Sequence, residues 1–263
     1  GGTLGILIPP SVILIIYSIL TEQNIAKMFL AAFVPGILAA IGYLMAIAIF
    51  VRIKPDSGPP TSYVGWRQRL NLFGQVWQIL VIFFLVIGGI YLGWFTPTEG
   101  ASIGAAGTGI MALFTKGFNF SDLIDVIKDT AVTSAMIFLV LLGAEFFNSF
   151  IALTQITNEL ATFVISNELS PYLVVFCILV LYILLGCLMD SLAMILLTIP
   201  VFFPIIIELD FGMSIEEVAI WFGILTLIVV EVGLITPPVG LNVFIINKIC
   251  LLYTSPSPRD LKL

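Results

Sequence analysis

Apolar segments that approach or exceed the length of a membrane span follow one another along most of this sequence. They are approximately residues 4–20, 29–51, 73–95, 100–115, 131–153, 170–189, 191–207 and 218–247. A helix needs about 20 consecutive apolar residues to cross the hydrocarbon core of a bilayer. Hydrophobic residues make up 60% of the chain and charged residues 10%, whereas a soluble domain is about half apolar and about a quarter charged. The sequence therefore predicts an all-α polytopic membrane protein.

Two of these segments contain the same helix-breaking motif. Gly5 to Pro10 reads GILIPP, and Gly233 to Pro238 reads GLITPP. Adjacent prolines remove two backbone donors and disfavour a helical conformation in the residue before them. Because hydrocarbon cannot satisfy the carbonyl groups so released, a break of this kind is expected where the backbone lines a cavity or holds a ligand. For either motif alone, a simple helix kink is the structural alternative.

The charged residues between the apolar segments predict the orientation of the chain. Lys and Arg are concentrated in loop 52–69, at 116–128 and at Lys248, whereas loops 154–169 and 208–217 contain acidic residues and no Lys or Arg. The positive-inside rule places the first group in the cytoplasm and the second group outside.

With this orientation, the two broken segments cross the membrane in opposite directions. Segment 29–51 must run inward to reach Arg52, so the segment before it runs outward, and 218–247 runs inward to Lys248. Interrupted helices in an inverted-topology repeat indicate the binding site of a secondary transporter. The sequence therefore predicts that free backbone groups at the breaks hold a ligand.

Asp190 and Ser191 separate two apolar arms, 170–189 and 191–207, whose far ends both lie near outer loops. A re-entrant hairpin would place Asp190 near mid-membrane, whereas two full spans would place it at the cytoplasmic face. Charge counting does not separate these alternatives. Asp190 is accordingly either a functional carboxylate or a cap of the second arm.

Carboxylates lie inside or beside the apolar segments at four positions: Glu99, Glu145, Asp190 and Glu231. Each costs a few kcal/mol or more in a bilayer unless it is paired or hydrated. The apolar segments contain no Lys or Arg, so a cation or a proton is the simplest partner. For the three glutamates, the sequence favours a protonated or hydrogen-bonded structural acid. Backbone carbonyls with the hydroxyls of Ser11 and Thr236 could supply the hard oxygen ligands that sodium requires.

Several functional classes are excluded by what the sequence lacks. Without histidine there is no Ser-His-Asp or Cys-His nucleophile and no HExxH zinc site, and without a GxxxxGK[ST] motif there is no P-loop for ATP hydrolysis. The three cysteines have no CxxC spacing, and no basic patch indicates nucleic acid. The chain is predicted not to be an enzyme.

Five stretches, taken in order, resemble the large membrane (permease) subunit of the tripartite ATP-independent periplasmic (TRAP) transporters, the DctM type. They are LGILIPPSVILIIYSIL, FVPGILAA, GGIYLGWFTPTEGASIGA, GCLMDSLAMILLTIPVFFP and EVGLITPPVGLNVF, and the resemblance covers nearly all of residues 1–249. It implies an elevator-type secondary transporter of the ion-transporter superfamily in the bacterial inner membrane. Such proteins take up an organic acid, such as a C4-dicarboxylate or sialic acid, in symport with a cation that is expected to be sodium. The resemblance also implies a small membrane subunit and a periplasmic substrate-binding protein as partners, and no cofactor besides the coupling ion.

In the family, two re-entrant hairpins face two interrupted helices, and each pair forms a cation site. The second pair here corresponds to 186–204 with 233–242, whereas the first hairpin would lie upstream of Gly1, so the chain is expected to be a fragment. Segment 233–238 is expected to be unwound, to face the 190–191 tip and to hold a cation there. The cation-binding candidates are Gly5, Ile8, Ser11, Asp190, Ser191, Gly233, Thr236 and Pro237. The substrate-binding candidates are Ser11, Ser191, Gly240 and Asn242.

The same resemblance divides the chain into parts. Residues 1–53 end the first repeat, 54–72 form a cytoplasmic loop, 73–169 are connecting transmembrane helices and 170–250 form the second repeat. The polar, Pro- and Ser-rich segment 251–263 is expected to be a non-native tail, with a natural cytoplasmic tail as the alternative.

Other functions stay open at the level of sequence. One is a different organic-anion or tricarboxylate carrier with the same inverted breaks. Another, of a different class, is an ion channel or a structural membrane subunit. The sequence also leaves open which acid is carried, and whether sodium or protons drive uptake, since the four carboxylates could serve protons.

We predict that loop 52–69 is cytoplasmic and that loop 208–217 is periplasmic. In a background without the three native cysteines, an impermeant thiol reagent applied to intact cells should label a cysteine placed in 208–217. A cysteine in 52–69 should be labelled only after the cells are opened. The reverse pattern would contradict the opposed directions of the two broken segments.

Overall fold

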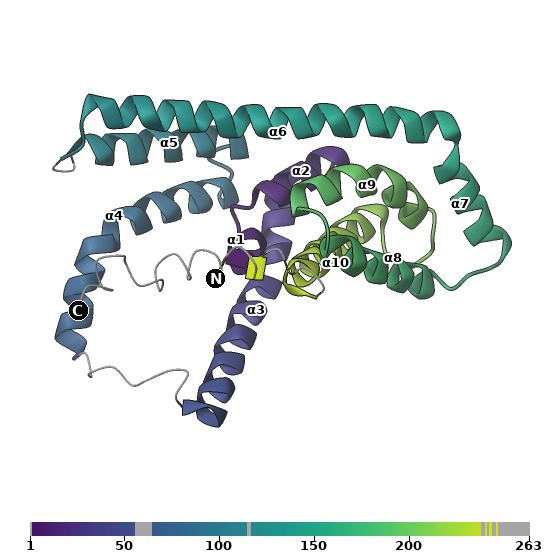
Figure 1. Ribbon diagram of the computed structural model, residues 1–263, viewed down its shortest axis with the longest axis horizontal. Helices are drawn as coiled ribbons and strands as arrows, with labels where there is room; N and C mark the ends of the chain where they lie inside the picture. Colours follow the sequence, from purple (N-terminus) through teal and green to yellow (C-terminus); the bar gives the residue numbers. More distant parts are fainter. Residues whose placement is uncertain are drawn as a thin grey trace, which may run out of the picture. The chain divides into compact units, whose positions relative to one another are not determined.

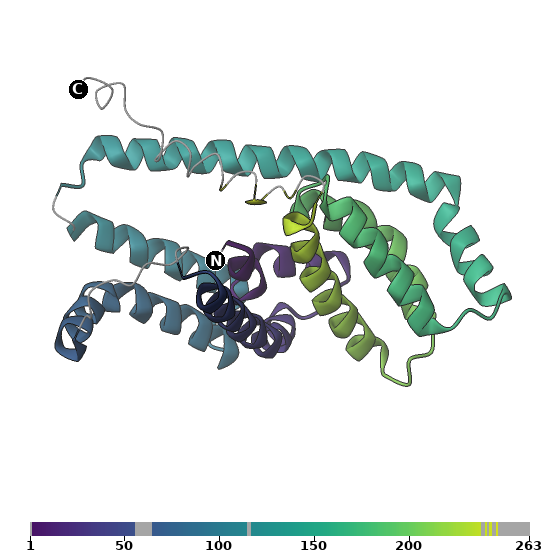
Figure 2. The same ribbon diagram turned by 60° about the horizontal axis from the view of Figure 1, so that its bottom comes forward.

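The computed structural model of this 263-residue chain describes residues 2–55, 65–114 and 117–237, together with residues 240, 242, 243 and 246. Within these residues, every regular element longer than one turn is an α-helix (Figure 1, Figure 2). The helices are α1 (Gly2–Leu7), α2 (Val12–Leu20), α3 (Ile25–Ile53), α4 (Trp66–Tyr91), α5 (Pro97–Phe114), α6 (Phe120–Thr154), α7 (Ile156–Ser166), α8 (Pro171–Gly186), α9 (Ser191–Ile207) and α10 (Ile215–Ile235).

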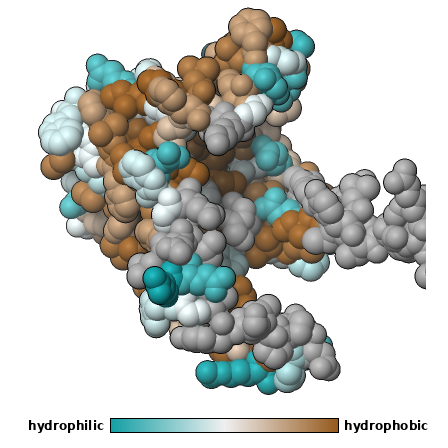
Figure 3. All heavy atoms as spheres, turned by 90° about the vertical axis from the view of Figure 1, so that its left-hand side faces the viewer, coloured by the Kyte–Doolittle hydropathy of each residue, from teal (hydrophilic) through white to brown (hydrophobic). Residues whose placement is uncertain are grey.

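Helices α3, α6 and α10 are each long and apolar enough to cross a membrane. Shorter apolar helices are formed by 76–91 of α4 and by α8 and α9. Large apolar side chains, among them Leu38, Leu44 and Ile53 of α3, are exposed, and hydrophobic residues occupy much of the face drawn in Figure 3. Since extensive apolar exposure marks a membrane or partner surface, the structure confirms the predicted class of all-α polytopic membrane protein.

The helix bounds differ from the sequence prediction in three places. Helix α4 begins at Trp66, inside the predicted loop 54–72, and α7 occupies part of the predicted outer loop 154–169. Helix α6 has 35 residues, or about 52 Å at 1.5 Å per residue, whereas the hydrocarbon core is about 30 Å thick. Apolar periodicity marks only the part of a helix that lies in hydrocarbon, so polar extensions at its ends are not predicted.

The chain forms two compact units, one of residues 33–138 and one of residues 1–32 with 139–263. In the first, α5 packs on α4 through glycines: a Cβ on Gly100 would lie 3.0 Å from the Ile90 side chain, and one on Gly107 would lie 3.1 Å from Ile82. Small residues allow two helices to approach this closely in a membrane.

The turn that leads into α5 shows what Glu99 does. The Glu99 carboxylate accepts hydrogen bonds from the Thr96 backbone N–H (2.8 Å) and the Thr96 hydroxyl (2.9 Å), and the Thr96 hydroxyl oxygen accepts from the Glu99 N–H (3.3 Å). This reciprocal arrangement is a capping box, with Pro97 at the first helical position. Glu99 therefore has the structural role that the sequence favoured.

In the second unit, α8, α9 and α10 pack on one another, α2 packs on α9 and α10, and α1 contacts α10. Tyr17 of α2 anchors this packing, because its hydroxyl donates to the Ala219 carbonyl at 2.7 Å. The Tyr17 ring lies directly against the Cα of Gly223 and meets the Phe203 ring edge-on, with the ring centroids 6.4 Å apart. Helix α2, from the first apolar segment, is thus buried against α9 and α10 near the other end of the chain.

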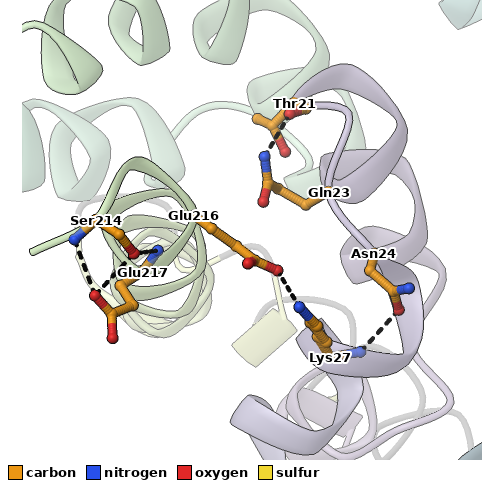
Figure 4. Close-up of polar contacts among 7 residues, drawn as sticks. All are labelled: Thr21, Gln23, Asn24, Lys27, Ser214, Glu216 and Glu217. Atoms are coloured by element: carbon orange, nitrogen blue, oxygen red, sulfur yellow. Dashed lines mark hydrogen bonds and ion pairs between the residues drawn. The ribbon is translucent and has the colours of Figure 1, made fainter.

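Helices α2 and α10 run antiparallel. The turn after α2 leads to Lys27, whose Nζ pairs with the Glu216 carboxylate at 2.6 Å, next to the capping box of Ser214 and Glu217 that starts α10 (Figure 4). The ion pair is exposed, so it contributes little to stability. Its position, together with the Tyr17–Ala219 hydrogen bond, places the end of α2 beside the start of α10.

We predict that Gly223→Ala destabilises the protein by about 1–3 kcal/mol, the usual cost of overpacking a well-packed core. The added methyl group would overlap the Tyr17 ring. Gly143→Ala on α6 is the matched control, because its Cβ would meet nothing within 4 Å and alanine is the better helix former. Thermal unfolding of the purified full-length protein in detergent measures both. Equal midpoints for the two variants would contradict this packing.

Candidate functional site

The tip between α8 and α9 is the short segment 187–190. The Asp190 backbone is extended, and its carboxylate oxygen Oδ2 accepts a hydrogen bond from the Leu192 N–H at 3.1 Å. Asp190 is thus the N-cap of α9, the structural alternative left open by the sequence. This bond uses one lone pair, and the exposed carboxylate keeps acceptor sites for a further ligand. The neighbouring Ser191 is buried.

The break in α10 begins at Thr236. Gly233 and Leu234 belong to the helix, which ends at Ile235, so the expectation that the whole of 233–238 is unwound was wrong for its first three residues. The Thr236 N–H donates to the Gly233 carbonyl at 3.0 Å, and the Thr236 hydroxyl donates to the Val232 carbonyl at 2.6 Å. Proline disfavours the helical conformation only in the residue just before it, so α10 continues to Ile235. Because the Thr236 N–H donates to Gly233, the Val232 carbonyl loses its helical donor, and the Thr236 hydroxyl takes its place.

Two glycines bring the end of α8 against the end of α10. A Cβ on Gly186 would lie 2.9 Å from the Gly233 Cα, and a Cβ on Gly233 would lie 2.8 Å from the Gly186 Cα. Just beyond this contact, the Cys187 Sγ lies 3.2 Å from the Ile183 carbonyl oxygen and 3.3 Å from the Pro237 carbonyl oxygen, so its single proton is shared between the two acceptors. The structure therefore brings the start of the α8–α9 tip into direct contact with the broken end of α10.

The chain after the break turns back toward α10. Gly240 is buried and has a positive φ of 55°, a conformation that favours glycine. A Cβ on Gly240 would lie 3.5 Å from the Ile235 carbonyl oxygen. Asn242 is half-buried, whereas Pro238 and segment 251–263 lie outside the described residues.

The first break separates α1 from α2. Ser11 is buried and is the N-cap of α2, with its hydroxyl oxygen accepting from the Leu14 N–H at 3.4 Å. Gly5 and Ile8 are exposed, and nothing described lies within 4 Å of a Cβ added to Gly5. Helix α1 contacts α10, but among the described residues no hydrogen bond joins the first break to the α8–α9 tip.

Glu231 on α10 was not among the sequence-predicted site residues. Its side chain is 7% exposed, and neither carboxylate oxygen has a hydrogen-bond partner among the described residues. The sequence favoured a protonated or hydrogen-bonded structural acid here, and the three-dimensional packing shows no hydrogen-bond partner for it among the described residues.

The tip and the broken end of α10 therefore offer carbonyls, hydroxyls and the Asp190 carboxylate. The described part of the chain contains no group of three or more His, Cys, Asp or Glu side chains that could hold a metal ion. Oxygen donors of this kind suit a hard cation.

Comparison with known proteins identifies the family. The family model described as "Tripartite ATP-independent periplasmic transporter, DctM component" matches residues 1–258, which includes the first part of the segment expected to be non-native.

Three curated relatives illustrate the match. The chain is 32% identical to the C4-dicarboxylate TRAP transporter large permease protein DctM of Pseudomonas aeruginosa, over 95% of this chain and 57% of the relative. It is 30% identical to the sialic acid TRAP transporter permease protein SiaT of Haemophilus influenzae, over 94% of this chain and 39% of the relative. It is 27% identical to the isethionate TRAP transporter permease protein DctMQ of Oleidesulfovibrio alaskensis, over 95% and 38%.

The chain thus spans little more than half the length of the first of these relatives and less of the other two. The family match covers both broken segments and the α8–α9 tip, and it confirms the resemblance inferred from the five sequence stretches. This integral membrane chain belongs to the large permease (DctM) family of the tripartite ATP-independent periplasmic transporters.

Proposed function

We propose that the full-length protein is the large permease subunit of a sodium-coupled secondary transporter for an organic acid. It acts in the bacterial inner membrane with a small membrane subunit and receives its substrate from a periplasmic binding protein. The observation that carries this proposal is the contact of the α8–α9 tip with the broken end of α10, at Gly186–Gly233 and Cys187–Pro237. Relatives named for C4-dicarboxylates and sialic acid support an organic acid as the substrate.

The lengths of α8 and α9 support a re-entrant hairpin. They have 16 and 17 residues, or about 24 and 26 Å at 1.5 Å per residue, whereas a full span needs about 30 Å. The hydroxyls of Tyr182 on α8 and Thr198 on α9 are hydrogen-bonded at 2.7 Å, and this buried bond holds the two arms together. Two short, joined arms fit a hairpin that enters and leaves on one side.

The direction of α2 and α10 supports an inverted repeat. Each adjoins a proline break, and the two run antiparallel in contact with each other. Interrupted helices of opposite direction are the arrangement that secondary transporters use at their binding sites. Helices α2, α8, α9 and α10 also share one compact unit, as an elevator mechanism requires of the body that carries the site.

The atoms at the break favour a cation. The Pro237 carbonyl is held by a thiol, which is a weak donor that a cation can displace. Because the Thr236 hydroxyl gives its proton to Val232, its lone pairs are free to face a ligand. With the Asp190 carboxylate and the Ser191 hydroxyl nearby on the tip, these atoms supply oxygen ligands of the kind that sodium takes in transporters.

The substrate is proposed to be held without basic side chains, because the apolar segments contain no Lys or Arg. The backbone of Gly240, the Asn242 amide and the hydroxyls of Ser11 and Ser191 are the candidate donors. Bound cations and neutral donors together can hold a carboxylate.

We predict that Thr236→Ala weakens sodium coupling in the full-length transporter reconstituted with its partners. Loss of a hydroxyl ligand, at about 1 kcal/mol, should raise the sodium concentration for half-maximal uptake about fivefold. Binding-protein docking should be unchanged. Thr108→Ala on α5 is the matched control, because its hydroxyl also donates to the carbonyl four residues earlier, that of Gly104. An equal sodium response in both variants would remove Thr236 from the site.

We predict that replacing Pro237 and Pro238 with alanine abolishes uptake while the protein stays folded. Two restored N–H groups would let α10 continue as a helix and would withdraw the Pro237 carbonyl from the tip. Uptake and a thermal unfolding midpoint, measured on the same reconstituted protein, separate the two effects. Normal uptake at the same sodium concentration would mean that the break is only a kink.

A further inference from the structure

The basic residues of this chain are concentrated where α3 ends and α4 begins. The whole sequence has 10 Lys and Arg residues, and four of them lie close together: Arg52, Lys54, Arg67 and Arg69. Asp56 is the one acidic residue in the sequence between 33 and 98, whereas the whole chain has a net charge of −6. Both helix ends belong to the compact unit of residues 33–138. An acidic chain thus carries one local surplus of positive charge.

This surplus is open to the surroundings. All four side chains are exposed. The ion pairs found within the described residues lie elsewhere, and Arg52, Lys54 and Arg67 take part in none of them. Exposed cations without acidic neighbours produce a positive potential that attracts anions. The ends of α3 and α4 are therefore suited to an anionic partner.

Aromatic rings accompany the cations at both helix ends. The Lys54 Nζ lies 5.9 Å from the centroid of the Phe50 ring, and the Arg69 Cζ lies 5.3 Å from that of the Trp66 ring. The Trp66 side chain is 71% exposed, and tryptophan is enriched where a membrane meets water. Each helix therefore presents a cation over an aromatic ring, an arrangement that suits the depth of lipid headgroups.

The neighbouring turns of both helices are apolar and exposed. They include Leu44, Ile47 and Phe50 on α3, and Phe73 and Trp77 on α4. An exposed apolar surface of this extent marks contact with lipid chains or a partner. Since one helical turn rises about 5.4 Å, lipids whose chains cover these turns have their headgroups at the cations.

We propose that the ends of α3 and α4 bind the phosphate groups of anionic phospholipids such as phosphatidylglycerol. The Arg52 and Arg67 guanidinium groups are suited to this role, because each offers a planar fork of N–H donors that matches phosphate oxygens. A zwitterionic lipid is bound more weakly, because its own ammonium group is repelled by the cations. The lipid site is separate from the α8–α9 tip and does not depend on the proposed sodium coupling.

Native mass spectrometry of the full-length protein in detergent measures binding of phosphatidylglycerol and of phosphatidylcholine with the same acyl chains. The protein is kept in sodium-free ammonium acetate. The parent protein should bind phosphatidylglycerol about tenfold or more tightly than phosphatidylcholine, and higher ionic strength should reduce this preference, because salt screens exposed charges. Equal affinities, or a preference that salt leaves unchanged, would overturn the inference.

Charge-removing variants locate the site. Arg67→Gln should weaken phosphatidylglycerol binding about fivefold, as expected for one cation near an anionic surface, and should leave phosphatidylcholine binding unchanged. Arg52→Gln combined with Arg67→Gln should weaken it about 25-fold. Lys128→Gln on α6 is the matched control, because Lys128 is also exposed but its Nζ pairs with the Asp125 carboxylate at 3.3 Å. An equal loss in Arg67→Gln and in the control would mean that overall charge, and not this site, attracts the lipid.

A soluble anion separates a lipid headgroup from a free phosphate compound. Inorganic phosphate carries the charge but has no acyl chains to cover the apolar turns, so it should not displace phosphatidylglycerol at equal concentration. Displacement by inorganic phosphate would assign the cations to soluble anions and would overturn the lipid proposal. Uptake is measured in none of these experiments, so a failure of sodium coupling would leave the lipid site standing.

Discussion

Every backbone polar group that is buried from water needs a partner, and in a membrane protein the hydrocarbon supplies none. The end of α10 is the place where this requirement is hardest to meet, because Pro237 and Pro238 carry no N–H. The chain meets part of it locally: the Thr236 N–H donates to the Gly233 carbonyl, which would otherwise lose its donor at Pro237, the Thr236 hydroxyl donates to Val232, and the Cys187 thiol donates to the Pro237 carbonyl. The third of these donors belongs to another element, so the break fixes where the α8–α9 tip must lie.

The close approach that the Cys187–Pro237 hydrogen bond needs explains the glycines where α8 meets α10. The Cys187 thiol reaches Pro237 only if α8 and α10 come very close, and Gly186 and Gly233 are in contact through their backbones. Near the middle of α10, Gly223 gives the same close approach to the Tyr17 ring of α2. At both positions, a side chain in place of the glycine would push α10 away from its neighbour.

The extent to which the sequence predicts this structure depends on the kind of signal. Length and apolarity place the helices, and the two Pro-Pro motifs locate both breaks, because a missing N–H acts locally. The start of the α10 break at Thr236 was not predicted, since it depends on a hydroxyl that replaces a backbone donor. Glu231 could be identified from sequence as a buried acid, but its lack of a partner is a property of the side chains of four other helices. The continuous α6 was missed because polar helix ends leave no apolar pattern.

Helix α9 shows why one proline break can be a kink and another a ligand site. Pro200 leaves the Leu196 carbonyl without its helical donor, and the Asn148 amide of α6 donates to that carbonyl at 3.4 Å, beside a cavity of about 290 Å³ that Pro200 and Pro204 line. An amide N–H is a full donor, whereas the thiol on the Pro237 carbonyl is a weak one. A cation would lose more by displacing the amide than by displacing the thiol. Pro200 thus lies inside a continuous α9, whereas the Pro237 carbonyl, beyond the end of α10, has only a weak thiol donor, as the proposed cation site requires.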